Sequence, residues 1–82
     1  MVRVRAAEVK NGHIVTVFFT DGSHRDIDFE RLLQGPVFEE IRNDEGRFRE
    51  LRVDPDFGCI EWANGADICP DVLYYDLPLA TE

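Results

Sequence analysis

The sequence predicts an α+β fold: an antiparallel sheet of four or five strands, built from a meander and a hairpin and covered by short helices. Residues 2–28 alternate apolar and polar side chains or concentrate β-branched and aromatic ones, with two turn dipeptides among them. Residues 29–49 instead carry helix caps and apolar residues at helical spacing, and residues 50–62 return to alternation. Strands, then helices, then strands are typical of an α+β domain.

The opening residues predict an antiparallel meander of three strands. Apolar and charged residues alternate from residue 2 to residue 6, which indicates a strand with one solvent-exposed face. The Asn-Gly dipeptide at residues 11–12 is a strong hairpin signal, because both residue types tolerate positive φ. Residues 14–20 are β-branched and aromatic on both faces, which predicts a central strand. An Asp-Gly turn at residues 21–22 then leads into a third strand over residues 24–28.

Three short helical segments follow the meander. Asp28 is positioned to cap a helix over residues 29–33, and the apolar spacing of residues 37–43 predicts another turn or two of helix. Asp44 begins a third turn, which places Phe48 in the core. None of these segments is long enough to be stable alone, so packing against the sheet must support them.

A second pair of strands is predicted after the helices. Residues 51–53 alternate between apolar and charged side chains, and residues 59–62 form another short strand. A turn that contains Pro55 and Gly58 separates them and favours an antiparallel hairpin. The Asn-Gly dipeptide at residues 64–65 is expected to end the fifth strand.

A short helix is predicted at the end of the domain. Pro70 suits the first turn of a helix, because a backbone N–H at this position would have no partner inside the helix. Pro78 would end the helix. The buried face of this helix is expected to contain Val72, Leu73 and Leu77. We expect a single compact domain over residues 1–78 and a frayed tail over residues 79–82.

The chain of 82 residues is expected to be a cytoplasmic protein. No apolar run approaches the roughly 18 residues that a membrane-spanning helix needs. The first residues follow a strand pattern rather than the pattern of a signal peptide. We therefore expect no association with a membrane.

The net charge of −8 is distributed unevenly. Residues 1–42 carry six basic and seven acidic side chains, whereas residues 53–82 carry seven acidic ones and neither Lys nor Arg. Because acidic surfaces repel phosphate, we expect no direct binding of nucleic acid. The acidity either maintains solubility or forms a docking face for a basic partner. The arginines that precede the acidic segment are expected to pair within the molecule: Arg42, Arg47, Arg49 and Arg52.

No arrangement of residues predicts catalysis or cofactor binding. The sequence has two histidines and two cysteines: His13, His24, Cys59 and Cys69. They lack the tight spacing of a zinc site, so we expect histidines exposed at turns and buried, reduced thiols. Each acidic residue has a local role available in a turn or at a helix start. We expect no catalytic residue, no metal and no cofactor, and therefore no enzyme.

The segment over residues 62–74 carries the most specific motif of the chain. It reads Trp62-Ala63-Asn64-Gly65-Ala66-Asp67, followed by Pro70-Asp71 and Leu73-Tyr74. Through these residues the chain resembles the domain of unknown function 2442 family of small bacterial proteins.

The resemblance implies a compact α+β domain without an established activity and without catalytic residues to carry over. Some members of that family are fused to a helix-turn-helix domain, which this sequence lacks, so direct DNA binding is not expected. Stand-alone members are often encoded beside another small protein, an arrangement similar to toxin–antitoxin pairs. The resemblance therefore implies a small protein partner encoded nearby.

The same segment supplies a candidate interaction surface of aromatic, acidic and amide side chains. Its six residues are Trp62, Asn64, Asp67, Asp71, Tyr74 and Tyr75. Each also has a structural interpretation: the tryptophan in the core, the first two polar residues in a tight turn, and the next acid at a helix start. Tyr74 and Tyr75 cannot both face inward on one helix, since neighbours point about 100° apart. One of them is therefore a candidate contact residue.

The leading hypothesis is a non-enzymatic protein–protein interaction module, the antitoxin-like or regulatory member of a two-gene bacterial operon. It would bind a small, basic protein through its aromatic and acidic surface. One alternative is a small ligand-binding domain or enzyme that uses the acidic loop around Asp67 and Asp71. Another alternative is a homodimeric structural or sensory domain.

Overall fold

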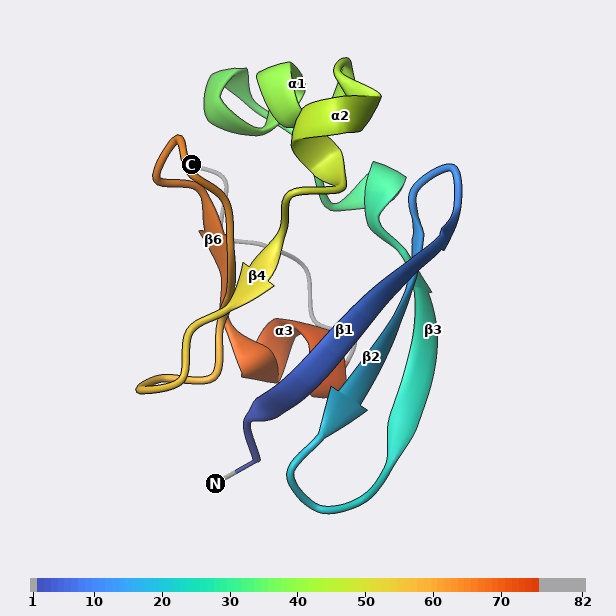
Figure 1. Ribbon diagram of the computed structural model, residues 1–82, viewed down its shortest axis with the longest axis vertical. Helices are drawn as coiled ribbons and strands as arrows, with labels where there is room; N and C mark the ends of the chain where they lie inside the picture. The colour runs from blue at the N-terminus through green and yellow to red at the C-terminus, as the bar shows by residue number, and fades with distance from the viewer. Residues whose placement is uncertain (1, 76–82) are drawn as a thin grey trace.

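Two three-stranded antiparallel sheets form the β part of this α+β fold, with short helices at both ends (Figure 1). The computed structural model describes residues 2–75. The first sheet has the strand order β1-β2-β3 and the second has the order β4-β5-β6. The predicted fold class is confirmed, but the prediction of one sheet with four or five strands is wrong.

The first sheet is the predicted meander. It comprises β1 (Val4–Asn11), β2 (Ile14–Phe19) and β3 (His24–Asp28), and β2 lies in the centre as expected. One face of β2 is fully buried because it forms one wall of the core. The residues on that face are Val15, Val17 and Phe19. On the opposite face the buried Thr16 hydroxyl donates to Asp26, which satisfies its hydrogen-bonding capacity.

Three short helical segments connect the two sheets. They are the 3₁₀ helix η1 (Phe29–Arg31), α1 (Pro36–Arg42) and α2 (Glu45–Phe48). The predicted caps are confirmed: the Asp28 carboxylate accepts from the Glu30 N–H at 3.0 Å, and Asp44 accepts from the N–H of residue 47 at 3.2 Å. These carboxylates satisfy N–H groups that have no partner inside the helix.

The second sheet consists of three two-residue strands. The predicted hairpin is formed by β4 (Arg52–Val53) and β5 (Ile60–Glu61), and β6 (Asp67–Ile68) was not predicted. The Asn-Gly dipeptide follows the end of β5, as expected, but the chain does not leave the sheet there. Gly65 has φ of 93° and turns the chain back so that β6 pairs with β5. Two residues are too few for alternation to reveal a strand.

The sheets remain separate because a turn, rather than a strand, joins them. β1 lies beside β4 (Figure 1), and the Val4 N–H donates to the Gly58 carbonyl at 3.0 Å. Gly58 has φ of 70°, and a Cβ at this position would collide with the Cβ of Arg3. The turn between β4 and β5 thus occupies the edge of β1. A continuous ladder of backbone hydrogen bonds between the two sheets would have to form at this edge.

Both sheets and the helices share one hydrophobic core. The described residues with the largest fully buried side chains come from each of these parts: Phe19, Phe29, Leu33, Ile41, Phe48, Ile60, Ile68 and Leu73. Burial of this apolar surface is the main force that stabilises strands as short as those of the second sheet.

The last described element is α3 (Pro70–Tyr74), which begins at proline as predicted. Leu73 is buried on its inner face and Val72 packs against the core. Leu77, Pro78 and the tail predicted for residues 79–82 lie outside the described residues. Within residues 2–75, none of the helices combines the length and the apolar character that a membrane crossing requires.

Candidate functional site

The six predicted site residues lie at two ends of strand β6. At one end, Trp62 and Asn64 belong to the turn between β5 and β6, next to α1 and α2. At the other end, Asp71 and Tyr74 belong to α3, and Tyr75 is its C-cap residue. Asp67 is the first residue of β6 and is exposed. The structure therefore divides the predicted surface into a turn region and an α3 region.

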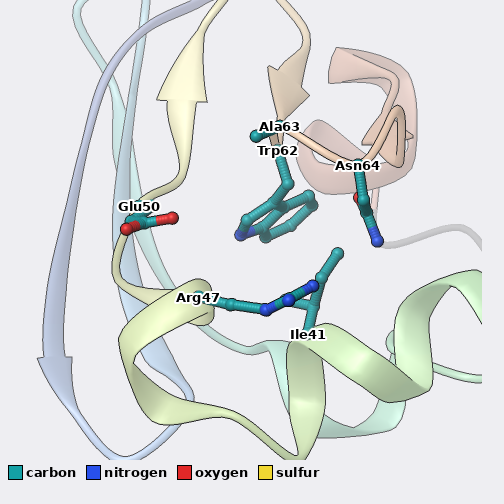
Figure 2. A pocket seen from close by; sticks show the side chains of 6 residues that line it. All are labelled: Ile41, Arg47, Glu50, Trp62, Ala63 and Asn64. Carbon is teal, nitrogen blue, oxygen red and sulfur yellow. The ribbon is translucent and has the colours of Figure 1, made fainter.

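Trp62 is a core residue whose outer edge lines a small pocket. Its side chain is 3% exposed, and the indole N–H donates to the Phe48 carbonyl at 3.1 Å. Figure 2 shows the indole between Glu50 and Asn64, above Ile41. The pocket has a volume of about 430 Å³ and is lined by Ile41, Arg47, Glu50, Trp62, Ala63 and Asn64. This pocket includes neither of the acidic loop residues that were predicted as a ligand site.

Asn64 links the turn between β5 and β6 to α1 by hydrogen bonds. Its side-chain amide donates to the Val37 carbonyl and to the Glu40 carboxylate, both at 3.1 Å, while its oxygen accepts from the Ala66 N–H at 3.1 Å. The side chain is exposed, but these bonds use both of its polar atoms. Its position near α1 requires the tertiary fold, since Val37 lies 27 residues away in the sequence.

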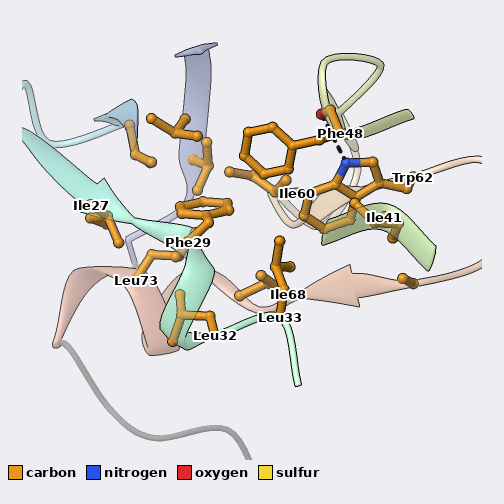
Figure 3. Packing of buried hydrophobic residues seen from close by; sticks show 14 of the residues in the cluster. Ile27, Phe29, Leu32, Leu33, Ile41, Phe48, Ile60, Trp62, Ile68 and Leu73 are labelled. Atoms are coloured by element: carbon orange, nitrogen blue, oxygen red, sulfur yellow. Dashed lines mark hydrogen bonds between the residues drawn. The ribbon is translucent and has the colours of Figure 1, made fainter. Parts of the chain in front are cut away.

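Aromatic packing explains why Trp62 lies inward. Its ring packs against those of Phe29, Phe38 and Phe48 with centroid distances of 6.3–6.4 Å. Figure 3 shows Trp62 beside Phe48 and the hydrogen bond from the indole to the backbone at Phe48. A buried tryptophan needs a partner for its N–H, and this bond supplies it.

The α3 region is anchored to the β2–β3 hairpin. The Tyr74 hydroxyl donates to an Asp21 carboxylate oxygen at 2.7 Å, and its ring packs edge-on against Phe19. The Arg25 guanidinium donates to the carbonyls of Leu73 and Tyr74 at 3.0 and 2.9 Å. A cation at the end of a helix also compensates the partial negative charge of its last carbonyls.

Tyr75 extends into solvent beside Tyr74. Its side chain is 61% exposed, and the two rings meet edge-on with centroids 4.9 Å apart. The prediction that only one of these tyrosines faces inward is therefore confirmed. Asp71 lies one turn before Tyr75 and is also exposed, so both residues occupy the outer side of α3.

The hydrogen bond between Tyr74 and Asp21 changes the pKa of both groups. The pKa of Asp21 is lowered, first by the hydroxyl and N–H of Ser23 and then by the Tyr74 hydroxyl. The pKa of Tyr74 is raised, because the Asp21 carboxylate accepts its proton in a hydrogen bond. Both shifts favour a carboxylate and a neutral phenol, the states that form this bond.

Most of the acidic side chains described after residue 52 lack a basic partner. Arg52 pairs with Glu61 at 2.9 Å across the second sheet, whereas Arg47 and Arg49 pair with acids of α1, α2 and the residue before α2. Within residues 2–75, no basic side chain lies within 4.0 Å of four other carboxylates: Asp54, Asp56, Asp67 and Asp71. Three of the four arginines therefore pair with acids as expected, whereas the Arg42 guanidinium donates to the Leu33 carbonyl at 3.0 Å.

Neither thiol is fully buried as expected, and one of the two histidines is not exposed. Cys59 is half-buried, but Cys69 is exposed, because Ile68 before it turns into the core and neighbouring strand residues face opposite sides. His13 is half-buried rather than exposed at a turn, with its Nε2 3.0 Å from the Arg42 carbonyl oxygen. The part of the chain that the structure describes contains no group of three or more residues that could hold a metal ion.

Comparisons with known proteins give a family but no activity. No curated protein and no solved structure matches the chain. Residues 4–78, which include the whole described segment from β1 to α3, match the family described as protein of unknown function (DUF2442). This agrees with the resemblance carried by the motif from Trp62 to Tyr74, and the chain therefore belongs to the DUF2442 family.

Proposed function

We propose that this chain is a cytoplasmic, non-enzymatic protein–protein interaction module that binds a small, basic protein. In this proposal it is the antitoxin-like or regulatory member of a two-gene bacterial operon, and the partner is encoded by the adjacent gene. The contact surface is the α3 surface, which we define as Asp67, Asp71, Tyr74 and Tyr75. Trp62 and Asn64 stabilise the β5–β6 hairpin, which precedes α3 in the chain.

The exposed aromatic side chain on α3 is the observation that carries the proposal. Tyrosine is enriched among the residues that contribute most to binding, because it buries a large area and keeps a polar tip. Tyr74, held by Asp21 and Phe19, provides a rigid base against which the Tyr75 ring rests. A ring that is already positioned loses less conformational entropy when a partner covers it.

The charge of the surroundings supports a basic partner. Asp67 and Asp71 are exposed and have no basic neighbour within the described residues. Complementary charge accelerates association and excludes partners of like charge. Because phosphate carries the same sign as these carboxylates, the surface does not suit nucleic acid.

The pocket beside Trp62 gives less support to the alternative of a ligand-binding domain or enzyme. Two of the three charged or amide side chains in its lining already have partners: Arg47 binds Glu40, and the Asn64 amide binds Val37 and Glu40. Asp67 and Asp71 are absent from its lining. The interaction module therefore remains the better explanation.

The test is a binding titration between this chain and the purified product of the adjacent gene. We expect a complex with a micromolar or lower Kd that weakens as the salt concentration rises. Tyr75→Ala should weaken it about 30-fold, the loss typical of an interface hot spot. The double variant Asp67→Asn and Asp71→Asn should mainly lower the association rate.

The matched control for Tyr75→Ala is Phe57→Ala. Phe57 is 69% exposed and lies on the turn between β4 and β5, outside the α3 surface. Its substitution should leave the Kd unchanged. No complex at micromolar concentrations, or equal losses for the two aromatic variants, would refute the proposal. A dimeric mass for this chain alone in light scattering would favour the homodimer instead.

A further inference from the structure

We propose that Cys59 and Cys69 form a redox-sensitive thiol pair, which a low-molecular-weight disulfide converts into an intramolecular disulfide. The bond would join the residue that precedes β5 to the residue that precedes α3. This inference concerns a modification site and does not depend on the proposed protein partner.

Strand register places the two cysteines opposite each other. In the pairing of β5 with β6, Ile60 faces Ile68 and Glu61 faces Asp67. One step further along both strands, residue 59 faces residue 69. Side chains alternate along a strand, and Ile60 and Ile68 point into the core. Both thiols therefore lie on the outer face of the second sheet.

The type of pairing suits a disulfide. The Trp62 N–H donates to the Ala66 carbonyl at 2.9 Å, so these two residues form a hydrogen-bonded pair. Hydrogen-bonded and non-hydrogen-bonded pairs alternate along antiparallel strands, which makes the pair of residues 59 and 69 non-hydrogen-bonded. Such pairs have Cα atoms about 4.5 Å apart, within the range of about 4.4–6.8 Å that a disulfide spans.

The surroundings of the two thiols assign different roles to them. Cys69 is exposed and accessible to a small oxidant, whereas Cys59 is half-buried. The pKa of Cys59 is raised to about 11, first by burial and then by the neighbouring Cys69 thiol and the charges of Asp67 and Asp54. Cys69 is therefore the residue that reacts first, and Cys59 is the residue that completes the bond.

The reaction consists of two thiol–disulfide exchanges. The Cys69 thiolate, after losing its proton to solvent, attacks one sulfur of oxidised glutathione, which breaks the S–S bond and releases one glutathione thiolate. Cys59 then loses its proton and attacks the Cys69 sulfur of the mixed disulfide, which releases the second glutathione thiolate. One small disulfide is reduced to two thiols, and one protein dithiol is oxidised to a disulfide. Burial is the first cause of the raised pKa of Cys59 and does not depend on the state of Cys69, so the second exchange should accelerate as the pH rises.

The test is incubation of the reduced chain with oxidised glutathione at pH 8, followed by intact mass and peptide mapping. We expect the wild-type chain to lose two hydrogens and to yield a peptide that links residues 59 and 69. The Tm should rise by about 5 °C or more, because the bond constrains the unfolded chain.

Single variants identify the order of the steps. Cys59→Ser should stop at a mixed disulfide with one glutathione on Cys69, and Cys69→Ser should react at least about 10-fold more slowly. Circular dichroism of each variant checks that it is folded. A wild-type chain that keeps a stable glutathione adduct, stays reduced or forms disulfide-linked dimers would overturn the proposal. The wild-type measurement alone decides this if a variant fails to fold.

Discussion

In the β1-β2-β3 sheet the strands have eight, six and five residues, whereas each strand of the β4-β5-β6 sheet has two. The first sheet is held by long ladders of backbone hydrogen bonds between neighbouring strands. The second is held mainly at its turns and by side chains that bind backbone groups elsewhere. Trp62 binds the carbonyl of Phe48, and Asn64 binds the carbonyl of Val37.

This difference shows how a small domain stabilises strands that cannot stand alone. A two-residue strand forms too few hydrogen bonds to offset the entropy lost on ordering it. In the second sheet the compensation comes from Ile60, Trp62 and Ile68, which are buried in the core shared with the first sheet. The second sheet should therefore be more sensitive to single side-chain substitutions than its few residues suggest.

The largest effect is expected for Trp62→Ala, which removes the main core contact of the second sheet. We expect a loss of about 3–5 kcal/mol in the free energy of unfolding, as for other buried aromatic residues. Urea denaturation followed by far-UV circular dichroism measures it, with Phe57→Ala as a control that should change stability by less than about 0.5 kcal/mol. Amide hydrogen exchange tests whether the core is shared. If the β2 amides of the Trp62→Ala chain stay fully protected while those of the second sheet exchange freely, the two sheets do not share a core.

A smaller effect is expected at the turn that separates the sheets. Gly58→Ala should cost about 2–3 kcal/mol, because the residue needs positive φ and its new Cβ would meet Arg3. Gly65→Ala is the matched control: its φ is also positive, but the surrounding space is open, so only about 1 kcal/mol should be lost. Equal losses for both variants would show that the contact with β1 is unimportant.

A loss of about 1 kcal/mol is expected for Asn64→Ala. The substitution removes three hydrogen bonds, two of which link the second sheet to α1. Asn43→Ala is a suitable control, because Asn43 is also exposed and has no side-chain hydrogen bond to any other described residue. Faster amide exchange at Ala66 in the Asn64 variant alone would locate the effect in the turn. Unchanged stability would mean that core burial by itself holds this hairpin.

The smallest effect is expected for Tyr74→Phe, which breaks a bond from α3 to the first sheet. The pKa of Asp21 is lowered first by Ser23 and then by the Tyr74 hydroxyl, so the Tyr74 contribution to stability is present above the ordinary pKa of 3.8 and is lost as the pH falls through the lowered value. The raised pKa of Tyr74 means that it is also lost as the pH rises above 10.0 through the raised value. The stability difference between wild type and variant should therefore be constant in between and shrink at both ends. Unfolding titrations across pH measure it, and a difference that is independent of pH would refute it.

Local signals in the sequence predict much of this fold. The meander follows from alternation and two turn dipeptides, and the helix starts follow from Asp28, Asp44 and Pro70. That Tyr74 and Tyr75 do not both face inward follows from helical geometry. Each of these predictions depends on residues that are only a few positions apart.

The partners of the candidate site residues are distant in the sequence and could not be predicted. Tyr74 binds Asp21 across 53 positions, and Arg25 binds the carbonyl of Leu73 across 48. The pocket beside Trp62 brings together residues from α1, α2 and the turn between β5 and β6. A periodic pattern shows which face of an element is apolar, but not which element covers it.

Backbone preferences and composition are enough to predict the α+β class, the first sheet, the caps of the short helices and the acidic character of the last third. Four features follow instead from tertiary contacts: the division of the strands into two sheets, the existence of β6, the outward position of Cys69 opposite Cys59, and the exposure of Tyr75 beside a fixed Tyr74. No local pattern predicts these features, because two-residue strands and exposed side chains have weak local preferences. Their arrangement follows from how the shared core fills and from where the turn at Gly58 meets β1.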